Sequence, residues 1–220
     1  MKNTIFKPPI TIGETIYQYI KKEIINGKFK LNQRLQEKDI ADLYGVSTTP
    51  VREAFHRLAA EKYLTISTRR EVIVAGTTLE EIKEVFEVVR ALDTLATKKA
   101  QKRLTNEDII KLKKMTETLG IYHRSKKIHL YDKENIELHK KLWKSSGNKF
   151  LYNTLTHLVE KTTFYKNQLI SLDEELSWLD KSYKDHLDIM KAIEKGDTEK
   201  VEKILMSHWG KGFLGEKNEA

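Results

Sequence analysis

Three of the chain's seven histidines lie where their side chains can share a metal ion. His139 follows Asn135 by four residues, so an imidazole and an amide oxygen project from one face of a helix. His186 and His208 lie in two later helical stretches, each beside apolar residues. Imidazole and oxygen groups are ligands of divalent metals, and such a set leaves coordination positions open for a small molecule. We therefore expect a divalent-metal site; the alternative is that each histidine is a core residue bonded to a carbonyl group.

A second group of polar residues lies between positions 47 and 52. Ser47, Thr48 and Thr49 precede Pro50. Ser and Thr favour the N-cap of a helix and Pro fits its first turn, so a helix should begin here and continue to about residue 60. Arg52 in that first turn can donate two hydrogen bonds to guanine O6 and N7, and the hydroxyl groups can donate to phosphates or bases. The pattern is typical of a DNA-reading helix.

Amphipathic segments around this helix supply its scaffold. Apolar residues recur at helical spacing over 15–25 and 35–44, and Gly45 suits a left-handed helix end. With the following helix they make a helix-turn-helix pattern. The short runs 63–66 and 71–74 are rich in aromatic and β-branched residues and predict a two-stranded hairpin, the wing. The other DNA contacts that we expect are Arg34, Lys38, Arg57, Arg69 and Arg70.

The rest of the chain has helical periodicity. The predicted helices span 79–102, 105–119, a stretch inside 125–146, 149–171, 176–195 and 198–209. Gly120, Gly147 and Gly196 are expected to separate them. We thus predict a mainly α chain with a winged helix-turn-helix at 1–76, an all-helical domain at 77–212 and a frayed tail at 213–220.

The composition narrows the range of functions. With 220 residues, 39% of them hydrophobic, the chain can bury a sizeable core, and the absence of cysteine excludes a disulfide scaffold, a Cys zinc finger, an iron–sulfur cluster and a Cys nucleophile. Neither a membrane-spanning run nor a secretory signal is recognisable, so we expect a cytoplasmic protein with no membrane partner. The net charge is +8, and residues 1–76 hold 13 Lys and Arg against 8 Asp and Glu, which favours a polyanionic partner for this part.

The stretch LNQRLQEKDIADLYGVSTTPVREAFHRLAAEKYLTI resembles the N-terminal winged helix-turn-helix of GntR-family transcription regulators, and VSTTPVREAF is close to that family's recognition-helix signature. The resemblance implies a homodimer that binds a pseudo-palindromic operator in double-stranded DNA, with Lys38, Thr48 and Arg52 among the contacts. The family often has Arg at the position of Thr48 and Gly in the wing at the position of Glu71. An acidic residue repels phosphates, so either Glu71 faces away or the two arginines before it compensate.

Residues 80–209 resemble the all-helical FCD effector domain of one GntR subfamily, through VVRALDTLATKKA, NIELHKKLWKSSGN and SYKDHLDIMKAIEKGDTEKVEKILMSHW. The resemblance implies a ligand-binding and dimerisation domain in which a metal such as zinc, nickel or manganese holds a small organic acid. The implied metal ligands are Asn135, His139, His186 and His208. Asn135 stands where the family commonly has Asp, and the lost negative charge weakens metal binding or favours zinc or nickel. Asp132 is a candidate to supply that charge.

Arg90, in VVRALD, has two interpretations. By the family resemblance it clamps the effector carboxylate through paired hydrogen bonds. Alternatively it forms an ion pair with Asp93 or Glu87 on the surface of its helix.

These patterns together predict a DNA-binding transcription regulator, a repressor rather than an activator and not an enzyme, whose operator affinity changes when a small carboxylate binds at the metal. Two other classes stay open. A metalloenzyme is one, because an imidazole site with open positions also suits hydrolysis, and it would turn over a substrate. The other is a non-specific DNA-binding protein, which would show a steep salt dependence and little sequence preference.

Overall fold

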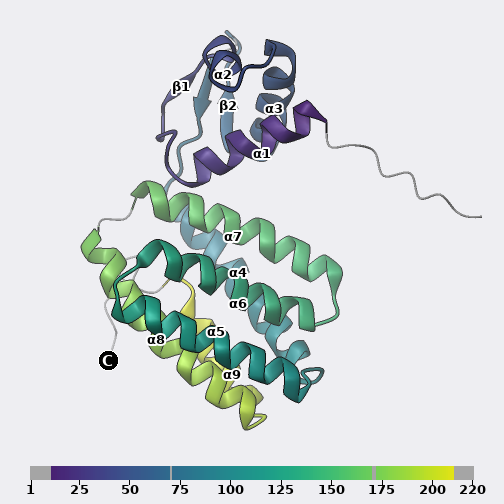
Figure 1. Cartoon of the computed structure of the whole chain (residues 1–220), viewed down its shortest axis with the longest axis vertical. Coiled ribbons are helices and arrows are strands. Elements are labelled where there is room, and N and C mark those ends of the chain that lie inside the picture. The colour runs from purple at the N-terminus through teal and green to yellow at the C-terminus, as the bar shows by residue number, and fades with distance from the viewer. Residues whose placement is uncertain (1–10, 70, 170–171, 211–220) are drawn as a thin grey trace, which may run out of the picture. The chain divides into compact units, whose positions relative to one another are not determined.

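The structure is a computed structural model that describes residues 11–69, 71–169 and 172–210 (Figure 1). The predicted tail at 213–220 lies outside these residues. Contacts divide the chain into two units, Met1–Thr77 and Thr78–Ala220. Both are mainly helical, which confirms the predicted fold class. In the part of the chain that the structure describes, no helix is both long and apolar enough to cross a membrane.

The first unit is a winged helix-turn-helix. Its elements are α1 (Ile12–Ile25), β1 (Arg34–Leu35), α2 (Glu37–Tyr44), α3 (Thr48–Ala60), β2 (Leu64–Ile66) and β3 (Val72–Val74). Gly45 ends α2 with a φ of 64°, the left-handed conformation that glycine adopts without steric cost. α1 packs against α3, and their buried residues include Ile20, Ile24, Phe55 and Leu58. This packing supports α3 from one side and leaves its first turn exposed.

The wing belongs to a three-stranded sheet, whereas we predicted two strands. The strand order is β1-β3-β2 and both pairings are antiparallel. β1 aligns Arg34 with Ile73 and Leu35 with Val72. A strand of two residues is too short to show alternating polarity, so it leaves no periodic signal in the sequence. As a result Arg34 is fixed beside the wing instead of lying in a loop.

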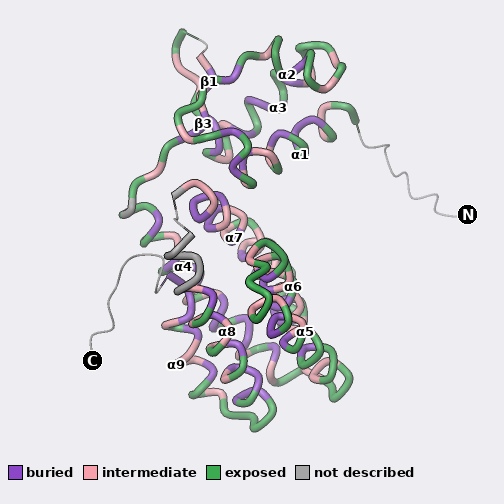
Figure 2. Tube along the Cα trace, turned by 60° about the vertical axis from the view of Figure 1, so that its left-hand side comes forward, coloured by how far each residue is buried: buried purple, intermediate pink, exposed green. Residues whose placement is uncertain are grey.

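The described part of the second unit is a bundle of six helices. They are α4 (Leu79–Gln101), α5 (Asn106–Arg124), α6 (Ile128–Ser145), α7 (Lys149–Leu169), α8 (Leu172–Glu194) and α9 (Thr198–His208). Capping boxes at Thr78 and Thr105 begin α4 and α5. Buried and exposed positions alternate along the helices, which therefore turn one face toward a shared core (Figure 2).

Gly120 does not end α5, contrary to our expectation. The helix continues to Arg124, and Gly120 is buried within it. A β-carbon at Gly120 would lie 2.5 Å from the hydroxyl oxygen of Tyr183 on α8. The glycine therefore allows two helices to approach closely, and the helix has no reason to stop there.

The packing of four helices brings the predicted metal ligands together. α9 packs against α4 and α8, and α6 packs against α4. Leu138 and Leu142 of α6 are buried in the same core cluster as Leu205 of α9. Histidines carried by α6, α8 and α9 can therefore meet inside one domain.

Candidate metal centre and DNA-reading helix

His139 of α6, His186 of α8 and His208 of α9 are buried and direct their Nε2 atoms at one another; we call them the imidazole cluster. Nε2 of His139 lies 3.1 Å from Nε2 of His186 and 3.2 Å from Nε2 of His208. Nitrogens bound at about 2.0–2.1 Å to one tetrahedral zinc ion are about 3.4 Å apart. The observed separations therefore suit ligands of a single ion.

Each imidazole of the cluster is held through its other nitrogen. Nδ1 contacts Asp93 Oδ2 at 3.3 Å in His139, Asp185 Oδ2 at 3.1 Å in His208, and the Ser182 carbonyl oxygen at 2.6 Å in His186. In His186 and His208 this acceptor forms a hydrogen bond, which keeps the ring hydrogen on Nδ1 and leaves the Nε2 lone pair facing the cluster. Nδ1 of His139 lies within ion-pair distance of Asp93, and that charge favours the same arrangement. Metal-bound histidines are held in this way, whereas core histidines without a metal would need a donor between their facing nitrogens.

The surroundings keep two of the imidazoles neutral. Burial lowers the pKa of His186 well below its ordinary value, and the neighbouring His208 and His139 lower it further. Burial also lowers the pKa of His208, although its hydrogen bond to Asp185 opposes this. A neutral imidazole is the form that binds a metal ion, so both side chains are ready to act as ligands at physiological pH.

Asp93 of α4 is a fully buried carboxylate behind His139, and the sequence patterns did not place it in the metal site. It accepts hydrogen bonds from Nε1 of Trp143 and from Nε1 of Trp209, both at 2.6 Å. Burial would raise the pKa of Asp93, but the attraction of His139 and these hydrogen bonds lower it to about 2. Asp93 therefore stays ionised and gives the cluster a fixed negative charge.

A pocket beside the imidazole cluster, which we call the α6–α7 pocket, holds about 550 Å³ of space without protein atoms, part of it open to solvent. Its polar wall consists of Asp132, Asn135, Thr162, Thr163, Lys166 and His208. Asn135 is 4% exposed, and its Oδ1 has no hydrogen-bond partner among the described residues. Because an unpaired buried amide oxygen is costly, this atom fits the oxygen ligand that we predicted.

Asp132 lies in the same pocket but is committed to another residue. Its Oδ2 is 2.5 Å from Nζ of Lys166 on α7, and that ammonium group lies 4.0 Å from the ring centre of Trp178. Burial raises the pKa of Asp132, and Lys166 opposes this change. Asp93 and Asp185, and not Asp132, are thus the described carboxylates that contact a cluster histidine.

Arg52 of α3 is held by Glu37 at the start of α2. Nε of Arg52 lies 2.9 Å from Oε1 of Glu37, and Nη2 lies 2.7 Å from Oε2. Hydrogen bonding to Glu37 raises the pKa of Arg52. A two-point contact of this kind fixes the plane of the guanidinium group. The exposed residues near it on α2 and α3 are Lys38, Ser47, Thr48 and Thr49.

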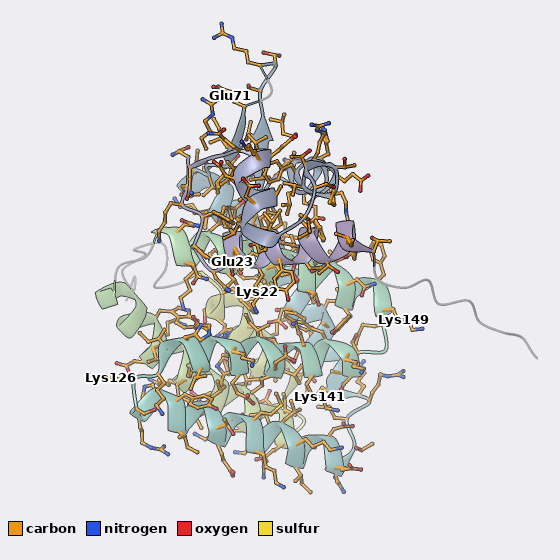
Figure 3. All side chains as sticks on the ribbon, turned by 45° about the horizontal axis from the view of Figure 1, so that its top comes forward. Lys22, Glu23, Glu71, Lys126, Lys141 and Lys149 are labelled. Carbon is orange, nitrogen blue, oxygen red and sulfur yellow. The ribbon has the colours of Figure 1, made fainter. Side chains whose placement is uncertain are left out.

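The wing carries an ion pair between predicted residues. Nη1 of Arg34 lies 2.8 Å from Oε1 of Glu71, which Figure 3 labels on the wing. Arg34 of β1 therefore compensates the charge of Glu71, a partner that we did not expect. Arg69 is exposed in the wing turn, and Arg70 lies outside the described residues.

Arg57 does not share the face of Arg52. Its Nη1 lies 2.6 Å from Oε2 of Glu14, and its guanidinium group lies 3.8 Å from the ring centre of Tyr17. Both partners belong to α1, so Arg57 stabilises the packing of α1 on α3. The predicted DNA contact of Arg57 stays a prediction.

Profiles of two protein families match the chain. The family described as "Bacterial regulatory proteins, gntR family" matches residues 12–74, and the FCD domain matches residues 84–211. The chain belongs to the GntR family and carries an FCD domain. A GntR-family chain of this type is a DNA-binding transcription regulator.

Similar regulators occur in several bacteria. The chain is 25% identical over 194 residues to the "Uncharacterized HTH-type transcriptional regulator YdhC" of Bacillus subtilis (strain 168). The aligned region covers 88% of this chain and 85% of that protein. It is 22% identical over 205 residues to the "HTH-type transcriptional repressor RspR" of Escherichia coli (strain K12), covering 93% of this chain and 89% of that one. The family and these relatives are regulators, which decides against the metalloenzyme alternative.

Solved structures of the GntR family share the fold. E. coli McbR/YncC superposes with a TM-score of 0.75 at 19% identity, covering 94% of this chain and 98% of that chain. A "putative transcriptional regulator GntR" from Rhodococcus sp. RHA1 superposes with a TM-score of 0.72 at 19% identity. The superposition covers 92% of this chain and 93% of that chain.

Arg90 of this GntR-family chain lies behind the pocket wall that the structure describes. Its Nε donates to the carbonyl oxygen of Trp209 at 2.6 Å, and Trp209 and Gly210 both line the α6–α7 pocket. Among the described contacts it forms no ion pair with Asp93 or Glu87. Arg90 thus holds the segment that follows α9 against α4.

Proposed function

We propose that this regulator is a repressor whose operator affinity changes when a small organic acid binds a divalent metal held by the imidazole cluster. The observation that supports this most strongly is the convergence of three buried Nε2 atoms, with a backbone or carboxylate oxygen near the Nδ1 atom of each ring. Oxygens placed in this way favour a hydrogen on Nδ1 and a bare Nε2. Neutral nitrogen lone pairs repel one another at this separation, and a cation between them removes the repulsion.

The proposed metal ligands are the Nε2 atoms of His139, His186 and His208 together with Oδ1 of Asn135. These four donor atoms are uncharged, so an anionic oxygen can take an open coordination position on the divalent ion without replacing a charged ligand. A set rich in imidazole favours zinc or nickel over manganese, for which carboxylates are the better ligands. When bound, the metal supplies a Lewis-acidic position for the carboxylate of an effector.

The proposed recognition helix is α3, with Arg52 reading base edges from the major groove. The exposed hydroxyls and Lys38 around it contact phosphates or bases, and Arg34 and Arg69 contact the backbone beside the wing. A homodimer presents two such helices to the half-sites of a pseudo-palindromic operator. Specific recognition separates this function from non-specific DNA binding.

α4 connects the metal centre with the DNA-reading unit along the chain. It begins at Leu79, directly after the first unit ends, and it carries both Asp93 and Arg90. Asp93 contacts His139, and Arg90 holds Trp209 at the pocket. An acid that shifts these contacts acts on α4. It lowers operator affinity if it binds more tightly to the arrangement of the protein that does not bind DNA. The coupling free energy between two such sites is typically about 1–3 kcal/mol.

Metal content tests this proposal directly. We expect about one zinc or nickel ion per chain in the wild type and in His157→Ala, which changes an exposed histidine of α7, and a large loss in His186→Ala. DNA binding in the absence of effector should survive in all three proteins. Equal metal content in the three would show that the cluster histidines are structural and would overturn the metal part of the proposal.

A further inference from the structure

We propose that two copies of this chain select each other through the outer face of α4, with the two α4 helices packed side by side in antiparallel directions. This inference rests on the proposed function, which includes a homodimer. It adds the surface that forms the dimer, the direction of the paired helices and the residues that choose the partner.

The outer face of α4 carries a line of exposed apolar residues. Val88 and Leu95 are 47% and 49% exposed, and Ala91 between them is exposed as well. They lie on the side of the helix opposite Val89 and Ala96, which are buried in the bundle. Exposed apolar residues that form a contiguous line, unlike single ones, mark sites of protein–protein contact.

This line has the spacing of a coiled-coil contact. Six residues follow one another along α4 at intervals of four and three; they are Glu84, Val88, Ala91, Leu95, Lys98 and Lys102, which we call the seam. A repeat that averages about 3.5 residues keeps one face of a helix directed at a second helix along its whole length. The seam is about 27 Å long, so a second helix of similar length fits it.

The charges along α4 favour one direction of the second helix. The exposed acidic residues of its first half are Glu80, Glu81, Glu84 and Glu87, against Lys83 alone, and its second half carries Lys98, Lys99 and Lys102 without an exposed acid. The helix dipole explains charges in the first and last turns, but Glu84 and Glu87 lie beyond the first turn. An antiparallel copy places each acidic half along a basic half, whereas a parallel copy would oppose like charges.

Side-chain sizes determine how the two helices are aligned. With the two-fold axis between Ala91 and Leu95, the small side chain of each helix faces the large one of the other. The same alignment places Glu84 opposite Lys102. Among the described residues, the side chains of Glu84 and Lys102 form no ion pair within the chain, so both are available to a second copy.

α7 enlarges the contact surface. Phe150, in the first turn of α7, is 81% exposed. The C-terminal end of α4 lies near this turn, because the guanidinium carbon of Arg103 is 2.9 Å from the position of a β-carbon on Gly147. In an antiparallel pair that end lies beside the first half of the second α4, so Phe150 can cover Val88 of the second copy. The second helix brings the contact closer to the area of about 800 Å² per partner that a stable interface buries.

Sedimentation equilibrium of the full-length protein tests this surface. Leu95→Glu places a charge in the centre of the contact and should raise the Kd of the dimer about 100-fold or more. Ile121→Glu is the matched control: Ile121 is 54% exposed on α5, which packs against α6 and α8, and its change should leave the Kd within about twofold. Both positions are exposed in the single chain, so both variants should keep the far-ultraviolet circular dichroism of the wild type.

Charge reversal tests the same surface without an apolar residue. Glu84→Lys should raise the Kd about tenfold, because two ammonium groups then face each other. Adding Lys102→Glu to the same chain should restore most of the affinity, since the pair is formed again with opposite sign. Glu117→Lys makes the same change at an exposed position of α5 and should leave the Kd unchanged.

Single cysteines report the direction of the helices, because the chain has no cysteine of its own. A mixture of the Glu84→Cys and Lys102→Cys proteins should give a dimer cross-linked by a short bismaleimide, and neither protein alone should. Cross-linking of each variant alone, without any in the mixture beyond that, would show parallel helices and contradict the inference.

The outcomes separate this inference from the proposed function. A dimer that Leu95→Glu leaves intact, a dimer that Ile121→Glu dissociates, or a charge reversal without rescue would overturn the inference and leave the proposed function standing. A wild type that is monomeric both alone and on its operator would instead overturn the homodimer of the proposed function.

Discussion

The Nδ1 atom of His139 lies 3.3 Å from Oδ2 of Asp93, and this charge contact favours a hydrogen on Nδ1 and a bare Nε2 facing the other two histidines. Asp93 is itself fixed by Trp143 and Trp209, which donate to its two oxygens. The orientation of the central imidazole is therefore set by a residue of α4 that is outside the ligand set.

Asp93→Asn should lower zinc affinity about 10–100-fold, because the amide no longer supplies the charge that orients and polarises His139. The free energy of unfolding should also fall by about 2 kcal/mol, since two hydrogen bonds to a charged acceptor are weakened. Competition with a chromophoric chelator measures the affinity. Asp188→Asn, on the outer part of α8, is the control, and unchanged zinc affinity in Asp93→Asn would show that His139 needs no such partner.

Glu37→Gln should reduce the discrimination between operator and random DNA about tenfold, because Arg52 loses the two-point contact that fixes its guanidinium plane. Affinity for random DNA should rise slightly, since one negative charge near the phosphates is gone. Asp42→Asn removes the same charge from an exposed position of α2. If both variants lose discrimination equally, the contact with Arg52 has no special role.

Arg52→Ala and Arg57→Ala should differ in kind. Loss of Arg52 should cost about 1–3 kcal/mol of sequence discrimination, a factor of about 5–150, with an unchanged thermal transition. Loss of Arg57 should keep the discrimination and lower the free energy of unfolding by about 0.5–1 kcal/mol, because its contacts are with Glu14 and Tyr17. Fluorescence anisotropy with an operator duplex and a random duplex measures the discrimination, and thermal denaturation measures the stability. If Arg57→Ala lost the discrimination and Arg52→Ala kept it, the DNA-reading face would contain Arg57 instead of Arg52.

Asp108→Asn should make the stability of the second unit less dependent on acid pH. Hydrogen bonds from Lys141, labelled in Figure 3, and from Thr105 lower the pKa of Asp108 to about 2, below its ordinary value of 3.8. The ionised form therefore adds stability above about pH 4, and this contribution is lost as the pH falls through 2. We expect the wild type to exceed the variant by about 1 kcal/mol at pH 7 and to equal it near pH 2 in denaturant titrations. A difference in the free energy of unfolding that stays constant from pH 7 to pH 2 would exclude the role of the charge. Glu117→Gln, which changes an exposed residue of α5, is the control.

Local patterns in the sequence predict most of the fold, because helix periodicity and cap residues act over a few positions. Asp93 shows what such patterns miss: its only signal is an acidic residue between Val89 and Ala96 on the apolar face of α4, and its role depends on helices that meet in the folded chain. Gly120 is similar, since whether glycine ends a helix or permits close packing depends on Tyr183, a residue of another helix. His186 and His208 were recognisable because each lies beside apolar residues in an amphipathic segment, and His139 because it follows Asn135 by one helical turn.

Operator affinity, measured with and without zinc and with and without a small organic acid that the zinc-loaded protein binds, tests the whole regulatory scheme. The duplexes are one selected from random sequences by the protein itself and a scrambled duplex of equal length. We expect the zinc-loaded protein to prefer the selected duplex by about 10³-fold or more, and the acid to change that affinity about 5–150-fold in the wild type but not in His186→Ala. Equal binding of the two duplexes over a range of salt concentrations, or an operator affinity that the acid leaves unchanged in the zinc-loaded wild type, would refute the scheme.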